Sequence, residues 1–108
     1  MAVQLHLCES CEGADLGILR AAIIAAGLSE DVAMSAQSCM NGCARPVSMA
    51  LQSPGRATYF FAGVNPAADC ADVVATLHAY VAAPAGWIED ARPCGRLRTC
   101  LVGRVPAL

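Results

Sequence analysis

The sequence contains no lysine, few charged residues and few aromatic residues. Its seven basic residues are all arginines, and nine acidic residues leave a formal net charge of −2 at pH 7. Nucleic acid and anionic membrane surfaces attract proteins through a surplus of positive charge, which this chain does not have. We therefore expect neither nucleic acid nor a membrane as its main partner.

Long apolar stretches are also missing. No stretch reaches the roughly 18 apolar residues that span a membrane, and residues 1–7 lack the basic and apolar regions of a signal peptide. We therefore expect a cytoplasmic protein. Hydrophobic residues make up 56% of the chain, but 22 of the 108 residues are alanine and only five are aromatic. The expected core is small, and small cores often depend on a metal or a covalent link.

The pattern of apolar residues predicts one α/β domain with the element order βαβββα. Alternation of apolar and polar residues indicates strands, and apolar residues three or four positions apart indicate helices. The expected elements are a strand over 3–8, a helix over 15–26, strands over 31–37, 47–52 and 56–61, and a helix over 65–84.

This order predicts a mixed four-stranded sheet packed against two main helices. The first helix joins two parallel strands, and Ser53-Pro54-Gly55 has the residues of a tight turn between antiparallel strands. We interpret the arrangement as a thioredoxin-like fold over residues 1–84. Residues 85–108 show no clear periodicity and are expected to form an irregular C-terminal tail packed on the same domain, through apolar residues that include Leu97 and Val102.

Seven cysteines are the largest departure from average composition. Because the cytosol keeps thiols reduced, clustered cysteines there are expected to be metal ligands or a catalytic pair. One pair, Cys8-x2-Cys11, follows the first strand, and a second pair, Cys39-x3-Cys43, follows the second strand. The carboxyl ends of parallel strands lie at one edge of a sheet, so the four thiols are expected to converge.

Four thiolates are the ligand set of a [2Fe-2S] cluster or of a structural zinc ion. We predict that Cys8, Cys11, Cys39 and Cys43 bind one such centre, with the cluster as the first choice and zinc as the alternative. The other three cysteines, Cys70, Cys94 and Cys100, are expected to be packing thiols without a metal role, with a second redox pair of Cys94 and Cys100 as the alternative.

The second cysteine pair carries a resemblance to known proteins. The run Cys39-Met40-Asn41-Gly42-Cys43-Ala44-Arg45-Pro46-Val47 resembles the second ligand pair of thioredoxin-like [2Fe-2S] ferredoxins, a group that includes a small subunit of respiratory complex I. Nearly the whole chain is similar to a family of small bacterial proteins of unknown function described as predicted metal-binding proteins. Members of that family are often encoded near cobalamin-synthesis and cobalt-handling genes, which implies a link to that metabolism.

These observations predict a small electron-transfer protein, not an enzyme, with one [2Fe-2S] cluster. Its expected partner is a redox protein, either a reductase or a metal-handling enzyme, and the resemblance implies a homodimer. Two other functions fit part of the pattern. A zinc or cobalt metallochaperone would use the same four thiolates, whereas a thioredoxin-like thiol–disulfide oxidoreductase would use Cys8 and Cys11 and leave Cys39 and Cys43 unexplained.

Overall fold

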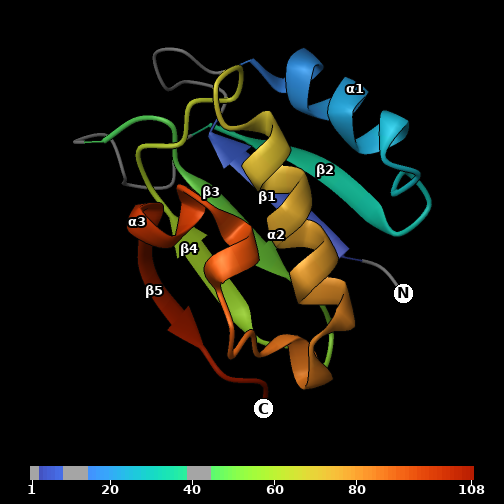
Figure 1. Ribbon diagram of the computed structural model, residues 1–108, viewed down its shortest axis with the longest axis vertical. Coiled ribbons are helices and arrows are strands. Elements are labelled where there is room, and N and C mark those ends of the chain that lie inside the picture. The colour runs from blue at the N-terminus through green and yellow to red at the C-terminus, as the bar shows by residue number, and fades with distance from the viewer. Residues whose placement is uncertain (1–2, 9–14, 39–44) are drawn as a thin grey trace.

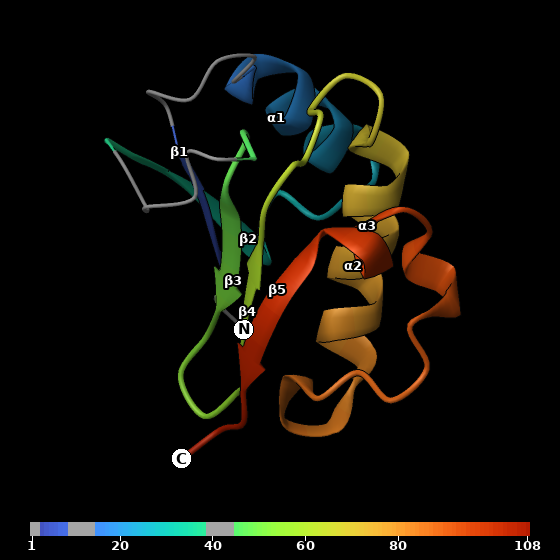
Figure 2. The same cartoon turned by 90° about the vertical axis from the view of Figure 1, so that its left-hand side faces the viewer.

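The computed structural model describes residues 3–8, 15–38 and 45–108. It contains a five-stranded mixed sheet in the order β2-β1-β3-β4-β5, with the helices against one of its faces (Figures 1 and 2). The elements are β1 (Val3–Cys8), α1 (Leu16–Ala25), β2 (Val32–Gln37), β3 (Met49–Gln52), β4 (Thr58–Phe61), α2 (Cys70–Ala82), the 3-10 helices η1 (Pro84–Gly86) and η2 (Arg92–Cys94), α3 (Leu97–Cys100) and β5 (Leu101–Val105).

The first four strands confirm the predicted mixed sheet. Strand β1 pairs with β2 in parallel and with β3 antiparallel, and β3 pairs antiparallel with β4. The turn between β3 and β4 is closed by a 3.0 Å hydrogen bond from the backbone N–H of Arg56 to the carbonyl of Ser53. Gly55 has a φ of 72°, which glycine adopts without steric cost at the third position of such a turn.

The core lies between the sheet and the helices. The alternating residues Val3, Leu5 and Leu7 of β1 are fully buried, and α1 and α2 each contribute apolar residues to the same cluster. Helix α1 begins where the sequence predicts, because the carboxylate of Asp15 accepts a hydrogen bond from the backbone N–H of Ile18 at 3.2 Å. None of the described helices is both long and apolar enough to cross a membrane.

The second helix starts later than predicted. Asn65 does cap a turn, since its side-chain oxygen accepts hydrogen bonds from the backbone N–H groups of Ala67 and Ala68, each at 3.1 Å. That turn does not continue into the helix, and α2 begins at Cys70. The capping signal at Asn65 is therefore real, but it belongs to the turn before the helix.

The expectation of four strands and an irregular tail is wrong. Residues 84–105 form η1, η2, α3 and β5, and β5 adds a fifth strand to the sheet beside β4. Leu97 is buried as expected, but Val102 is exposed. The strand signal is weak because β5 lies at the edge of the sheet and all five of its residues are exposed, so apolar residues do not alternate along it.

Candidate metal centre

Of the four predicted ligands, the structure describes Cys8. It is the last residue of β1, and the residue is 1% exposed. The other three, Cys11, Cys39 and Cys43, lie outside the described residues. The geometry of the candidate site is therefore given by Cys8 and by the residues that flank the two cysteine segments.

These flanking residues meet at one end of the sheet. Cys8 is opposite Gln37 in the parallel pairing of β1 and β2, and its thiol lies 3.8 Å from the carbonyl oxygen of Ser38. Ser38 directly precedes Cys39 in the sequence. On the other side, the backbone N–H of Cys8 donates a 3.1 Å hydrogen bond to the carbonyl of Ser48. The ends of both cysteine segments are thus brought to the same end of the sheet, where β1 and β2 finish, as the strand order predicts.

Ser48 is a feature of this site that the sequence did not indicate. It precedes β3 as a polar residue between Val47 and Met49, a pattern typical of an exposed side chain. In the structure Ser48 is 0% exposed, and its hydroxyl has no hydrogen-bond partner. The register of β1 against β3 places Ser48 beside Cys8. The residues around Ser48 in the sequence do not reveal this register.

The chain after the second cysteine pair is attached to the loop that follows β4. The carbonyl of Arg45 accepts a 2.6 Å hydrogen bond from the backbone N–H of Gly63. Val47 and Val64 exchange two backbone hydrogen bonds, at 3.0 and 3.1 Å. The segment that carries Cys39 and Cys43 is therefore anchored at its carboxyl side by the same loop that contacts the C-terminal elements.

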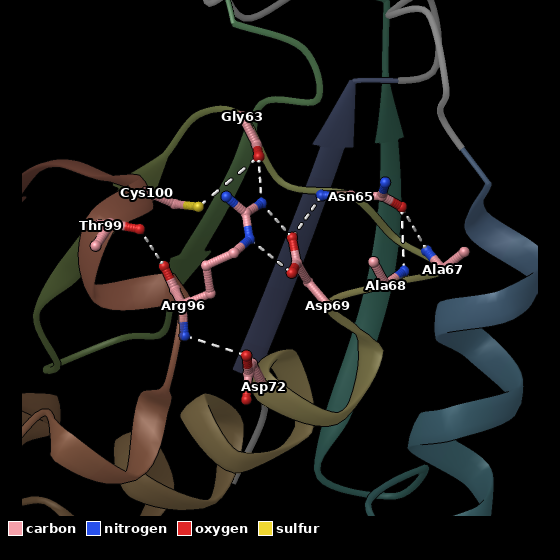
Figure 3. A network of polar contacts seen from close by, with 9 residues as sticks. All are labelled: Gly63, Asn65, Ala67, Ala68, Asp69, Asp72, Arg96, Thr99 and Cys100. Atoms are coloured by element: carbon pink, nitrogen blue, oxygen red, sulfur yellow. Dashed lines mark hydrogen bonds and ion pairs between the residues drawn. The ribbon is translucent and has the colours of Figure 1, made fainter.

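A polar network joins this loop to the C-terminal elements (Figure 3). The guanidinium of Arg96 donates to the carboxylate of Asp69, with Nε at 2.8 Å from Oδ1 and Nη2 bonded to Oδ2, and Nη2 also donates to the carbonyl of Gly63 at 2.6 Å. The backbone N–H of Asn65 donates to the same carboxylate at 2.7 Å. The Arg96 hydrogen bonds hold the pKa of Asp69 below its usual value, against the opposing effect of burial.

The remaining cysteines lie in the core or against it. Cys94 and Cys100 are buried, Cys70 is partly buried, and all three are free thiols. The thiol of Cys100 lies 3.8 Å from the carbonyl of Gly63, and burial raises its pKa. Within the described residues, no group of three or more histidine, cysteine, aspartate or glutamate side chains is arranged to hold a metal ion.

His6 lies on the sheet face opposite the core, between two glutamines from neighbouring strands. Its Nδ1 is 3.3 Å from the side-chain nitrogen of Gln37, and its Nε2 is 3.1 Å from that of Gln52. Both ring nitrogens therefore already have a neighbour on the sheet.

The fold and this site define a small mixed α/β protein with a cysteine at the carboxyl end of its first strand and two cysteine segments that start from one edge of the sheet. A protein-family model matches residues 5–107, and the chain therefore belongs to the family described as protein of unknown function (DUF1636). Neither a curated protein nor a solved structure matches the chain.

Proposed function

We propose that this protein is an electron carrier with a thioredoxin-like fold, in which Cys8, Cys11, Cys39 and Cys43 bind one [2Fe-2S] cluster. The observation that carries the proposal is the contact between the thiol of Cys8 and the carbonyl of Ser38, at 3.8 Å. It brings the first cysteine segment next to the start of the second. Two chelating pairs at one edge can supply four sulfur ligands to a single small centre.

The fold supports this placement. The order β2-β1-β3-β4, with α1 between the two parallel strands and α2 after the hairpin, is the arrangement that we interpret as thioredoxin-like. In such open sheets, functional groups collect at the carboxyl ends of the parallel strands. Cys8 occupies that position on β1, and Ser38 follows the corresponding end of β2.

The burial of Cys8 favours metal binding over thiol exchange. A thiol that attacks a disulfide in another protein must be accessible, and reactive cysteines lie in partly exposed positions. Cys8 is the first cysteine of its pair and is 1% exposed. A metal ligand carries no such requirement, because a metal centre can be enclosed by the loops that bind it.

The donor set fits the cofactor, since cysteine thiolates are the usual ligands of iron–sulfur clusters. When bound, such a cluster supplies reversible one-electron transfer. The chain contributes the four sulfur ligands, and the carboxyl end of β1 orients Cys8 toward the segment that carries Cys39 and Cys43. We propose a redox protein as partner, either a reductase or a metal-handling enzyme, and a homodimer as the working assembly in the cytoplasm.

Single serine substitutions test the proposal on protein purified without oxygen. We expect wild-type protein to be brown, to contain two irons and two sulfides per chain, and to give an EPR signal after one-electron reduction. Cys8→Ser, Cys11→Ser, Cys39→Ser and Cys43→Ser should each lose or alter this spectrum. Cys94→Ser is the matched control, because Cys94 is also buried but belongs to η2, which packs against α2 and α3.

The alternatives give different results in the same experiment. Colourless protein with one tightly bound zinc per chain would support the metallochaperone, and colourless protein that reduces disulfides through Cys8 and Cys11 would support the oxidoreductase. A brown protein whose spectrum is unchanged in Cys39→Ser would contradict the proposed ligand set.

A further inference from the structure

The hydroxyl of Ser48 is a buried hydrogen-bonding group without a partner. Within the described part of the chain, only two buried side-chain polar atoms lack a partner, the Oγ of Ser48 and the Nε of Arg56. The Arg56 guanidinium is otherwise satisfied, since its Nη2 donates to three carbonyls at the end of α2. Ser48 has no such compensation. Native proteins rarely leave a buried hydroxyl unpaired, because burial removes the water that would bind it.

The position of Ser48 points to Cys8 as the neighbour that this hydroxyl serves. The antiparallel register of β1 and β3 pairs His6 with Ala50 and Leu7 with Met49. The next pair in this register is Cys8 and Ser48, whose backbones are joined by a 3.1 Å hydrogen bond. Directly opposite residues project from the same face of a sheet, with Cβ atoms about 4.5–5.5 Å apart. The side chains of Ser48 and Cys8 are therefore neighbours on one face of the sheet.

The charge on this sulfur decides whether it is a good hydrogen-bond acceptor. A neutral thiol is a weak acceptor. A thiolate bound to a metal keeps negative charge, and hydrogen bonds to charged acceptors are stronger. We propose that Ser48 donates a hydrogen bond to the metal-bound sulfur of Cys8 and thereby sets the reduction potential of the site. This inference rests on the proposed function, because metal binding is what holds Cys8 as a thiolate.

The direction of the effect follows from the charge. Reduction adds one negative charge to a centre bound by four thiolates, so a donor beside one of its sulfurs stabilises the reduced form more than the oxidised form. Removal of the donor should therefore make reduction harder. Ser48 is a positioning residue in this scheme, since it acts through the sulfur of Cys8.

The test compares Ser48→Ala with Ser35→Ala in protein reconstituted with iron and sulfide. Ser35 is a matched control, because it lies on β2 opposite His6 and its hydroxyl already accepts a 2.9 Å hydrogen bond from Gln37. We expect both variants to bind iron and sulfide like the wild type. The equilibrium constant for reduction should fall about tenfold in Ser48→Ala, which for one electron is about 59 mV, and should not change in Ser35→Ala.

Resonance Raman spectra and metal-free protein provide two further readouts. The Fe–S(Cys) bands should shift in D2O for the wild type and for Ser35→Ala, and the shift should be reduced in Ser48→Ala. Without metal, Ser48→Ala should unfold at the same or a higher temperature than the wild type, because it removes an unpaired buried hydroxyl. A serine that only held the sheet together would instead give a lower melting temperature.

The outcomes separate this inference from the proposed function. A full cluster in Ser48→Ala with the wild-type potential would overturn the role of Ser48 and leave the cluster assignment intact. A wild-type protein that binds no iron and sulfide would overturn the proposed function, and this inference with it.

Discussion

Arg96 joins the C-terminal segment to the loop that anchors the candidate site. Its side chain is 49% exposed, but the carboxylate that it contacts, on Asp69, is only 3% exposed. Asp69 accepts hydrogen bonds from Arg96 and from the backbone of Asn65. A second ion pair joins Arg92 to Asp90, and their side chains are 81% and 55% exposed, respectively. Water screens this pair, so it is a comparison for the partly buried pair of Arg96 and Asp69.

We predict that Arg96→Ala destabilises the protein and that Arg92→Ala does not. Loss of Arg96 leaves a buried carboxylate without its main partner, which costs about 1–3 kcal/mol of unfolding free energy. Loss of Arg92 exposes a carboxylate that water already solvates. Urea unfolding followed by circular dichroism measures both. Equal effects of the two substitutions would contradict the difference in burial as the cause.

Asp69 gives the stability a defined pH dependence. Its folded-state pKa is lowered, chiefly by the Arg96 hydrogen bonds. The ionised form is therefore favoured by folding, and this contribution is present above the unfolded pKa of about 3.9 and is lost as the pH falls through the lower folded value. We expect the stability difference between wild type and Asp69→Asn to shrink as the pH is lowered from 7 to below 4. A difference that stays constant over this range, measured by urea unfolding, would contradict the assignment.

At the scale of elements, residues 84–105 complete the fold. Leu97 of α3 is fully buried in the main core, and the hydroxyl of Tyr59 on β4 accepts a 2.7 Å hydrogen bond from the backbone N–H of Ile88. The Arg104 guanidinium of β5 lies 3.8 Å from the ring centroid of Trp87 and donates to the carbonyl of Ile88 at 2.9 Å. These contacts make the C-terminal elements part of the same packed unit as the sheet.

We predict that Leu97→Ala costs about 2–5 kcal/mol of unfolding free energy, as for other large core residues. Leu101→Ala is the control, because Leu101 is also a leucine of the C-terminal segment but is 37% exposed. Its substitution should cost much less unfolding free energy. Chemical denaturation of the two variants gives the comparison. A small effect of Leu97→Ala would mean that the C-terminal elements are not coupled to the core.

At the scale of the whole molecule, the proposed centre would connect an interior strand of the sheet to both cysteine segments. Cys8 ends the interior strand β1, which lies between β2 and β3 in the sheet, and the segment with Cys39 and Cys43 connects β2 to β3 in the sequence. Metal bound to all four residues would therefore restrain three adjacent strands. Because ligand binding to the folded state alone adds to stability, the cofactor should contribute to the stability of the fold.

We predict that removal of iron and sulfide lowers the melting temperature of the wild type. Differential scanning calorimetry of cluster-bound and metal-free protein measures the change, and a Cys8→Ser protein that has lost the cluster should melt like the metal-free wild type. An unchanged melting temperature after metal removal would show that the site is independent of the stability of the fold.

Local sequence patterns determined the first four strands, the hairpin turn and the start of α1. Alternation in Val3, Leu5 and Leu7 needs only one buried face, the turn needs Pro54 and Gly55, and the α1 cap needs Asp15 within three residues of its donor. These signals act within a few residues of each other. The sequence can therefore report them without knowledge of the fold.

Contacts between distant residues decided the rest. Strand β5 forms because β4 provides an edge with which it can pair. The ionised form of the buried Asp69 is stabilised by Arg96, a residue 27 positions later in the sequence. Ser48 is buried because β3 pairs with β1. The cysteine spacing alone identified the candidate ligands, and the structure adds that Cys8 lies beside Ser38 and Ser48. The register between strands sets such neighbours, and register depends on the packing of the whole sheet.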